Sequence, residues 1–395
     1  MVIAAIILSQ LAIWIDHRYG NTWLKEMWFV ALNQPDGARA ILATVAGSMI
    51  TVAGVTFSLT TLAVSHASSQ FGPRLLNNFM HDRGNQITLG TFVATFIYCL
   101  LVLRVVRGED VVAMDGLAVS VFVPQLSLFL AFILTMGSVV VLIYFIHHVP
   151  NSLQITSLLQ RLATDMRHDL DKLYPVDLGS GVDESDFATH VAFQAEHAIA
   201  SVSDGYIQGI DEVELIEFAR DRVVVIQLLR RPGDFVRKGE RIAEVSACED
   251  WKQEDASRIH RTVTIGFGRT PTQDAFYVLN EFVEVAVRAL SPGMNDPFTA
   301  MQCIDWLSTG LVQLSKKELP NRYRADKAGE VRIITAEITH KQFVDAILWQ
   351  LVPYVKTDVN TLNYMLLSLE RTVAISECAG LNSLISDVMR KLKSA

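Results

Sequence analysis

Small hydroxyl residues recur at a fixed spacing within residues 40–73, a stretch of 34 positions without a formal charge. Four of them follow one another every seven residues and two more are offset by four, which places all six on one face of a helix. They are Thr44, Ser48, Thr51, Ser58, Ser65 and Ser69. Hydroxyl oxygens can replace part of an ion's hydration shell, which makes these residues candidates for the lining of a pore.

A second interpretation of this polar face competes with the first. Gly47 and Gly54 flank the six residues, and small residues let two membrane helices approach closely while their hydroxyls hydrogen-bond across the contact. None of the six is ionisable, which disfavours a carrier that works through buried charges. The other faces of the segment are assigned the large apolar residues Ile50, Val52, Phe57, Leu59 and Leu62.

The densest set of polar residues lies at 291–300, between two segments with helical periodicity. Asp296 followed by Pro297 predicts the N-cap and first residue of a helix, and helix N-termini attract anions. The candidate ligand residues are Arg288, Ser291, Asn295, Asp296 and Thr299. The competing interpretation is a structural loop in which Asp296 caps the helix and pairs with Arg288. The negative charge of Asp296 itself opposes an anion.

Common catalytic and metal-binding motifs are absent from the sequence, among them the nucleophile elbow, the Walker loop, HExxH and GxGxxG. Its four cysteines, Cys99, Cys248, Cys303 and Cys378, are far apart, which excludes a local zinc motif and fits a reducing compartment. We therefore expect no metal, no cofactor and, on balance, no enzyme. The net charge of −8 argues against a nucleic-acid partner.

Charge is distributed unevenly between the two parts of this 395-residue chain, half of which is hydrophobic. Residues 1–150 carry 7 of the 34 Lys and Arg residues and 7 of the 42 Asp and Glu residues, so the whole net charge lies beyond residue 150. This distribution predicts an α-helical transmembrane bundle followed by a soluble domain.

The transmembrane domain is expected at 1–149, with about four spans near residues 2–15, 40–64, 84–106 and 117–146. Amphipathic segments at 23–32 and 74–80 are expected to lie at the membrane surface. An even number of spans places both termini on one side. A large domain with reduced cysteines is most simply cytoplasmic, so we expect the N-terminus and the C-terminal domain inside.

The soluble part is expected to be α+β. Residues 150–196 predict a juxtamembrane helix and linker, 197–247 a small β-barrel-like unit, and 248–395 a mainly helical domain. The string RPGDFVRKGERIAEV is similar to the hairpins of biotinyl- and lipoyl-carrier barrels but has no modifiable lysine site. Strands are expected at 198–202, 223–229, 242–245 and 331–335. A short strand at 235–236 is expected to form a compact hairpin with 242–245 through the turn at 238–240. Helices are expected at 211–220, 274–290, from 296, and at 340–352, 359–376 and 381–392.

Two long strings carry a family resemblance: FSLTTLAVSHASSQFGPRLLNNFMHDRGNQ and RTPTQDAFYVLNEFVEVAVRALSPGMNDPFTAMQCIDWL. Together they resemble a bacterial family described as predicted membrane proteins with a domain of unknown function, over nearly the whole chain. The resemblance implies a bacterial inner-membrane location and brings no activity or catalytic residue. Members have a longer lead into the first span, which predicts that this sequence starts late.

The leading functional hypothesis is an oligomer with an ion channel or transport pore lined by the second span, and a cytoplasmic domain for assembly or gating. The alternative is a membrane-anchored ligand-binding or signalling protein without a pore. The expected partners are the lipid bilayer, further copies of the chain, and a small ion or anionic ligand.

Overall fold

The computed structural model describes residues 1–19, 34–71, 83–107, 121–152, 154–183, 193–248 and 250–394. The chain forms two compact units, Met1–Ser157 and Leu158–Ala395. The two amphipathic segments predicted at 23–32 and 74–80 lie outside the described residues. Each unit has its own hydrophobic core.

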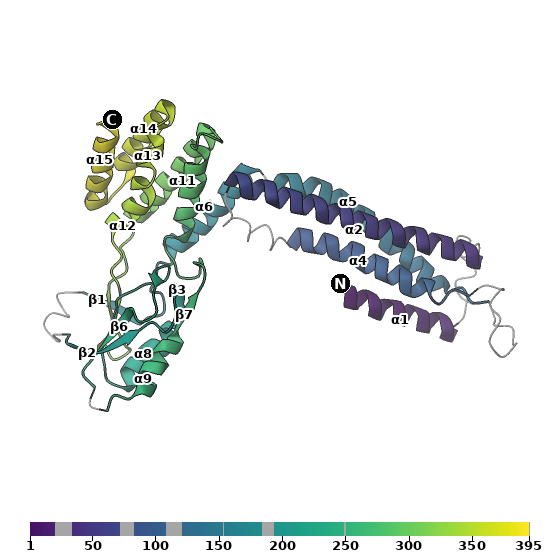
Figure 1. Cartoon of the computed structure of the whole chain (residues 1–395), viewed down its shortest axis with the longest axis horizontal. Coiled ribbons are helices and arrows are strands. Elements are labelled where there is room, and N and C mark those ends of the chain that lie inside the picture. Colours follow the sequence, from purple (N-terminus) through teal and green to yellow (C-terminus); the bar gives the residue numbers. More distant parts are fainter. Residues whose placement is uncertain are drawn as a thin grey trace. The chain divides into compact units, whose positions relative to one another are not determined.

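Unit 1 consists of long apolar helices that run side by side (Figure 1). They are α1 (Val2–Tyr19), α2 (Pro35–Phe71), α4 (Arg83–Leu103) and α5 (Gln125–Ser152). Three stretches are long and apolar enough to cross a membrane: Pro35–Ser65, Arg83–Leu103 and Gln125–His148. The transmembrane bundle is thus confirmed with three candidate spans. Four spans are not, although α1 forms a helix packed on α4 and α5.

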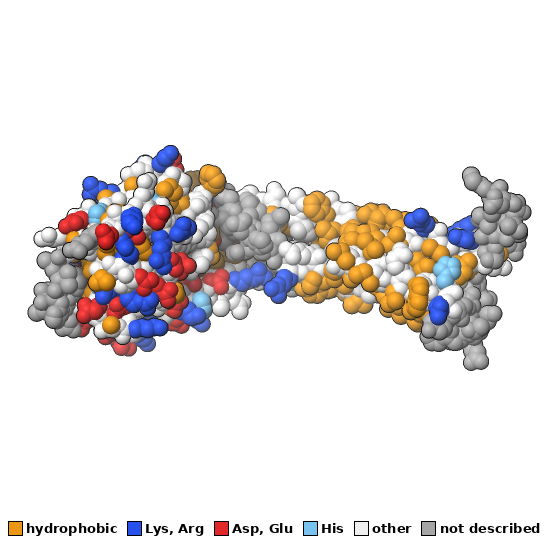
Figure 2. Space-filling model, turned by 90° about the horizontal axis from the view of Figure 1, so that it is seen from below, with side chains coloured by type: hydrophobic (Ala, Val, Ile, Leu, Met, Phe, Trp, Pro, Cys, Tyr) orange, Lys and Arg blue, Asp and Glu red, His pale blue; other side chains and the backbone are white. Residues whose placement is uncertain are grey.

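On the face shown in Figure 2, hydrophobic side chains gather along this unit, whereas many charged side chains are spread over unit 2. Exposed apolar residues include Ile50, Phe132 and Val140. Water would penalise such a surface, and the hydrocarbon of a bilayer would not. The division follows the charge distribution of the sequence.

Asp16 near the end of α1 is buried, and both oxygens of its carboxylate accept hydrogen bonds. One oxygen accepts from the backbone N–H of Leu126 at 3.0 Å, and the other accepts from the N–H and hydroxyl of Ser127 at 3.0 and 2.7 Å. These are groups of the first turn of α5, which has no intrahelical partner for its N–H groups. Asp16 therefore caps α5 from another helix and fixes α1 to the bundle.

Replacing Asp16 by alanine is expected to lower the stability of unit 1 by about 1–2 kcal/mol, because it removes a charged cap from a helix N-terminus. Thermal unfolding of the purified full chain in detergent measures the effect. Asp36→Ala is the control, since Asp36 also lies in a first helical turn but its side chain is 96% exposed. Equal melting temperatures for the two variants would contradict the capping role.

Unit 2 contains two open sheets, and the β-barrel-like unit expected from the sequence is wrong. The larger sheet has the order β1-β8-β9-β4-β6-β2, in which β4 and β9 are parallel and all other neighbours antiparallel. The smaller has the antiparallel order β5-β3-β7. The strands are β1 (Ser180–Val182), β2 (Ala195–Ala200), β3 (Gly205–Ile210), β4 (Ile226–Leu228), β5 (Phe235–Val236), β6 (Arg241–Ser246), β7 (Val263–Gly266), β8 (Tyr323–Ala325) and β9 (Val331–Ile334).

The hairpin predicted from Phe235–Val236 and residues 242–245 does not form. Both segments are strands, but β5 pairs with β3 while β6 pairs with β2 and β4. The turn between them is held instead by the N–H of Gly239, which donates to the carbonyl of Ser201 at 2.8 Å. Partners distant in sequence therefore override the local hairpin pattern.

The helices of unit 2 confirm most of the predicted helical segments, including the cap at Asp211, which accepts from the N–H of Glu214. α8 and α9 contribute to the core of the β-rich part, and the other helices beyond α9 form the C-terminal part (Figure 1). The helices are α6 (Ile155–Asp171), α8 (Glu212–Asp221), α9 (Gln253–Thr262), α10 (Tyr277–Ala289), α11 (Pro297–Ser315), α12 (His340–Val344), α13 (Val352–Val355), α14 (Val359–Ile375) and α15 (Ala379–Lys393), with a π-helical turn, η2 (Asp345–Trp349), after α12.

Candidate functional site

The six polar residues of the second span all lie on the exposed side of α2. The side that packs against the neighbouring helices is lined by small and apolar residues instead: Ala38, Leu42, Ala46, Met49, Ala53 and Thr56. A side chain added at Gly47 or Gly54 would meet nothing within 4 Å. The polar face therefore lies on the side of α2 away from the residues that pack against the neighbouring helices.

The exposed face also contains two larger apolar residues. Ser48, Val55, Leu62 and Ser69 follow one another every seven residues, and Leu62 lies four residues after Ser58. Leu62 is 67% exposed and Val55 is 53% exposed. The assignment of Leu62 to another face is therefore wrong. The polar face thus contains two neighbouring rows of side chains. One row consists of hydroxyl residues throughout, Thr44, Thr51, Ser58 and Ser65. The other row has Ser48 and Ser69 at its ends and Val55 and Leu62 between them.

A cavity of about 360 Å³ lies on a different side of α2, between α2, α4 and α5. Thr56, Thr60, Asn85 and Thr88 contribute its polar lining, and Phe145 contributes apolar surface. None of the six polar-face residues lines it. The cavity and the polar face are therefore separate features of unit 1.

The connection at 291–300 joins α10 to α11 and is built from internal hydrogen bonds. Asp296 caps α11, accepting from the N–H of Thr299 at 3.2 Å and from its hydroxyl at 2.6 Å. The hydroxyl of Ser291 donates to the carbonyl of Arg288 at 2.6 Å. Asn295 adopts a left-handed backbone conformation with φ of 47°, which asparagine tolerates better than most residues.

The structure brings these five candidates together, and hydrogen bonds join Ser291 to Arg288 and Thr299 to Asp296. The guanidinium of Arg288 lies 3.6 Å from Glu284 on its own helix. The predicted cap at Asp296 and the helix start at Pro297 are confirmed. This geometry favours a tight helical connection, because the polar groups that would contact a ligand already hold the loop.

A cavity of about 360 Å³ lies elsewhere in unit 2, where the β-rich and helical parts meet, and we refer to it as the junction cavity. Its walls come from the turn 231–234 between β4 and β5, the segment 269–274 before α10, the first turn of α10, and η2. Single π-helical turns are frequent at functional sites. The volume is typical of a small-ligand site.

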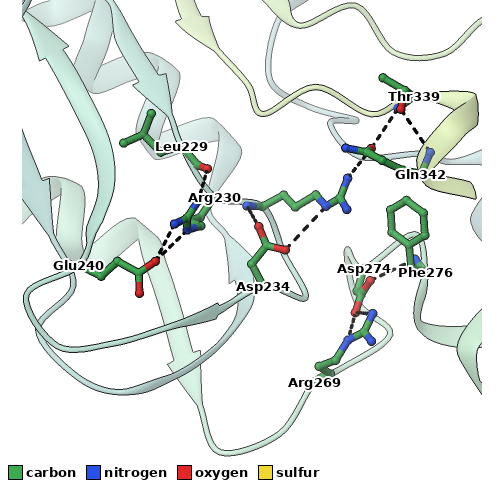
Figure 3. Close-up of polar contacts among 10 residues, drawn as sticks. Leu229, Arg230, Asp234, Glu240, Arg269, Asp274, Phe276, Thr339 and Gln342 are labelled. Atoms are coloured by element: carbon green, nitrogen blue, oxygen red, sulfur yellow. Dashed lines mark hydrogen bonds and ion pairs between the residues drawn. The ribbon is translucent and has the colours of Figure 1, made fainter. Parts of the chain in front are cut away.

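Asp274 is the buried carboxylate of the junction cavity, with 2% of its side chain exposed. Its oxygen Oδ2 lies 2.7 Å from Nε and 2.6 Å from Nη2 of Arg269, and Oδ1 accepts from the N–H of Phe276 at 3.1 Å (Figure 3). Gly233, with φ of 95°, lies against this carboxylate, and a Cβ there would collide with it. Only glycine allows the turn and the ion pair to approach so closely.

Arg231 reaches across the junction cavity to the helical part. Its guanidinium lies over the ring of Phe276, 4.5 Å from the centroid, and Nη1 donates to Oε1 of Gln342 at 2.9 Å. Phe276 stacks in turn on Phe343, with centroids 4.7 Å apart. The adjacent Arg230 instead binds Glu240 (Figure 3), so two neighbouring arginines have different roles.

Burial shifts the pKa of two charged groups of the junction cavity, Asp274 and Arg231. It raises the pKa of Asp274 above its ordinary value, although Arg269 acts in the opposite direction. It lowers the pKa of Arg231, opposed by Asp234. Each charge therefore depends on its partner, because a carboxylate or guanidinium taken out of water favours its neutral form.

Sequence reasoning missed the junction cavity. Arg269 and Asp274 belong to the second of the two strings that carry the family resemblance, and this was the feature of the sequence that could have pointed to them. Nothing local indicates that Arg231 meets Gln342, which lies 111 residues later. Among the described residues no group of three or more His, Cys, Asp or Glu side chains is placed to hold a metal ion.

Comparison with known proteins gives a family and relatives. The family model described as "Predicted membrane protein (DUF2254)" matches residues 1–371. "Uncharacterized protein MT1328" of Mycobacterium tuberculosis (strain CDC 1551 / Oshkosh) is 36% identical over 309 residues, and "Uncharacterized protein Mb1321c" of Mycobacterium bovis (strain ATCC BAA-935 / AF2122/97) is 35% identical over 309 residues. Each match covers 75% of this chain and 56% of the relative, so the chain spans little more than half of these relatives. No solved structure matches.

Proposed function

We propose, from the premise that the chain belongs to the Predicted membrane protein (DUF2254) family, that several copies assemble in the bacterial inner membrane around a cation-conducting pore. The polar face of α2 lines the pore, with α1 as a fourth span. The soluble unit lies on the cytoplasmic side and serves assembly or gating. The observation that carries the proposal is the exposure of all six polar residues on the side of α2 opposite its packed face.

The length of the polar face suits a path across the membrane. From Thr44 to Ser69 the helix rises about 38 Å, compared with roughly 30 Å of hydrocarbon in a bilayer. A polar row of this length facing lipid would leave hydroxyls in hydrocarbon, which is unfavourable. Facing other copies of α2 around a central axis gives these residues water or one another as partners.

The hydroxyl geometry favours cations. Thr51 donates its hydroxyl hydrogen to the carbonyl of Gly47 at 2.8 Å, and Ser58 donates to Gly54 at 2.9 Å. Since these donors are used within the helix, the outward oxygens remain as acceptors. A ring of acceptor oxygens stabilises a partly dehydrated cation and not an anion.

Replacing Ser58 by leucine is expected to reduce potassium flux through proteoliposomes at least about tenfold, which corresponds to about 1.4 kcal/mol of added barrier. The leucine removes an acceptor oxygen and narrows the path in every subunit. Phe57→Leu is the control, because Phe57 lies one residue earlier, is 60% exposed and is not on the polar face.

The same position separates pore formation from simple assembly. In Ser58→Cys, disulfide cross-links between copies are expected if the polar faces meet around an axis. Cross-linking together with zero flux in the unmodified protein would mean that the face is only a packing surface, and would overturn the pore proposal.

A membrane-anchored ligand-binding protein without a pore is the second candidate function. The observation that favours it is the junction cavity of unit 2, which has the volume of a small-ligand site and a mixed polar lining. The two candidates are separable, since binding to unit 2 does not require flux through unit 1.

A further inference from the structure

We infer that the junction cavity binds a small molecule with one carboxylate group and further hydroxyl or ammonium groups, with the guanidinium of Arg231 holding the carboxylate. This goes beyond the proposed pore and does not depend on it. The observations that support it are the incomplete pairing of Arg231, the free polar groups around it and the balance of charge in the cavity.

Arg231 is the cation of the junction cavity whose charge is least compensated. Arg269 makes close contacts to Asp274, at 2.6 and 2.7 Å. The nearest approach of a carboxylate oxygen to the Arg231 guanidinium is instead 3.8 Å, from Asp234 to Nε, which is beyond hydrogen-bonding distance. The hydrogen bond of its guanidinium goes to the neutral amide of Gln342. A guanidinium has five N–H donors, so most of them remain for a ligand.

The orientation of Arg231 suits a planar anion. Its guanidinium carbon lies over the ring of Phe276, 4.5 Å from the centroid, and 21% of the side chain is exposed. An arginine held over an aromatic ring can still offer the N–H groups at the edge of its guanidinium to a partner. Carboxylates fit this edge with two parallel hydrogen bonds.

Other polar groups of the junction cavity are available to the rest of a ligand. The side-chain amides of Asn280 and Gln350 line it and make no hydrogen bond to any residue that the structure describes. Asp345 also lines it, paired with the exposed Lys341. Amides and a carboxylate in this position can accept from hydroxyl or amino groups of a small molecule.

The charges around the cavity favour a ligand with a single negative group. Arg231 and Arg269 face three carboxylates in the lining, those of Asp234, Asp274 and Asp345. Lys341 beside Asp345 supplies a third positive charge, so the set is neutral and not basic. A phosphate monoester carries close to two negative charges at neutral pH, since its second pKa is about 6. The nearby carboxylates repel a second negative charge, so a carboxylate is favoured over a phosphate ester or a polyphosphate.

The experiment measures binding to the full chain in detergent by calorimetry and by the shift of its melting temperature. The probes are glycerate and serine, with acetate lacking the extra groups, glycerol lacking the charge, and glycerol 3-phosphate as the phosphate arm. Glycerate or serine is expected to bind at least tenfold more tightly than acetate or glycerol. If neither binds, or if glycerol 3-phosphate binds more tightly, the inference is overturned.

Variants assign the binding to this cavity. Arg231→Gln is expected to weaken binding at least tenfold, and Arg231→Lys to weaken it as well because lysine lacks the planar edge. Arg230→Gln is the matched control, because Arg230 is adjacent to Arg231 in the sequence but its guanidinium donates to Glu240. Asn280→Ala and Gln350→Ala remove no hydrogen bond within the described structure, so they should weaken binding without changing the melting temperature of the unliganded chain.

A purely structural role of Arg231 gives the opposite pattern. Binding that survives Arg231→Gln, or that is unchanged in both Asn280→Ala and Gln350→Ala, would overturn the assignment. Ser58→Leu serves as a cross-check, because it should reduce potassium flux at least about tenfold and leave carboxylate binding unchanged. Failure of the pore and failure of the ligand site are thereby distinguished.

Discussion

Potassium flux through the reconstituted protein is expected to rise at least about tenfold when Leu62 is replaced by serine. Leu62 lies on the polar face between Ser58 and Ser65 and is 67% exposed. In the proposed pore each subunit contributes one such side chain, which makes a ring of leucines across the path. Apolar constrictions of this kind close a pore by excluding water. A ring of serines removes that barrier, and a change of about 1.4 kcal/mol already gives a tenfold effect.

Ile50→Ser is the matched control for this prediction. Ile50 is also exposed, at 44%, and lies in the same helix. It makes an angle of roughly 120° with Leu62 around the helix axis, which points it toward the bilayer in the proposed assembly. Both variants replace an aliphatic side chain of the same size by serine, so the main difference is position. Equal flux in Leu62→Ser and Ile50→Ser would refute Leu62 as a constriction.

The two variants at Ser58 and Leu62 are expected to act in opposite directions. A polar-to-apolar change on the lining adds a barrier, and an apolar-to-polar change removes one. A helix face that only packs against another copy would respond differently, because both changes would disturb packing and reduce assembly. Measuring oligomer size beside flux therefore separates the two interpretations of the polar face that the sequence left open.

The sequence predicted the existence of the polar face of α2 but not the side on which it lies. Spacing of seven residues places Thr44 and Thr51 on one side of any helix. It does not say whether that side or the one with Ala46 and Ala53 packs against the neighbouring helices. The structure buries the alanine side, where small side chains allow close packing. The hydroxyl that it buries, that of Thr56, donates within the helix to the carbonyl of Ala53 at 2.9 Å.

The junction cavity of unit 2 could not be predicted from local sequence patterns. The cap at Asp296 was predictable because its partner Thr299 is three residues away. The contact of Arg231 with Gln342 was not, because it depends on how the sheets and helices pack. The barrel-like unit was expected wrongly for the same reason. β5 and β6 are strands as predicted, but each pairs with strands that are distant in sequence.

Removal of the Asp274 carboxylate is expected to destabilise unit 2 by about 3–5 kcal/mol, the cost of leaving one member of a buried ion pair without its partner. In Asp274→Ala the guanidinium of Arg269, 20% exposed, loses its partner carboxylate, and the N–H of Phe276 loses its acceptor at the start of α10. For a unit of this size the melting temperature should fall by roughly 10 °C. Hydrogen exchange of peptides covering residues 269–290 in the full chain locates the change.

Asp221→Ala is the control for the loss of an aspartate, because Asp221 pairs with Arg220 at 3.1 Å with both side chains about half exposed. Such a surface pair contributes about 0–1 kcal/mol, so the melting temperature should hardly change. The double variant Asp274→Ala with Arg269→Ala tests the cause. If the loss comes from an uncompensated charge, removing Arg269 as well restores part of the stability. If it comes from lost packing, the two effects add, and the ion pair is not what holds the turn at Gly233 against α10.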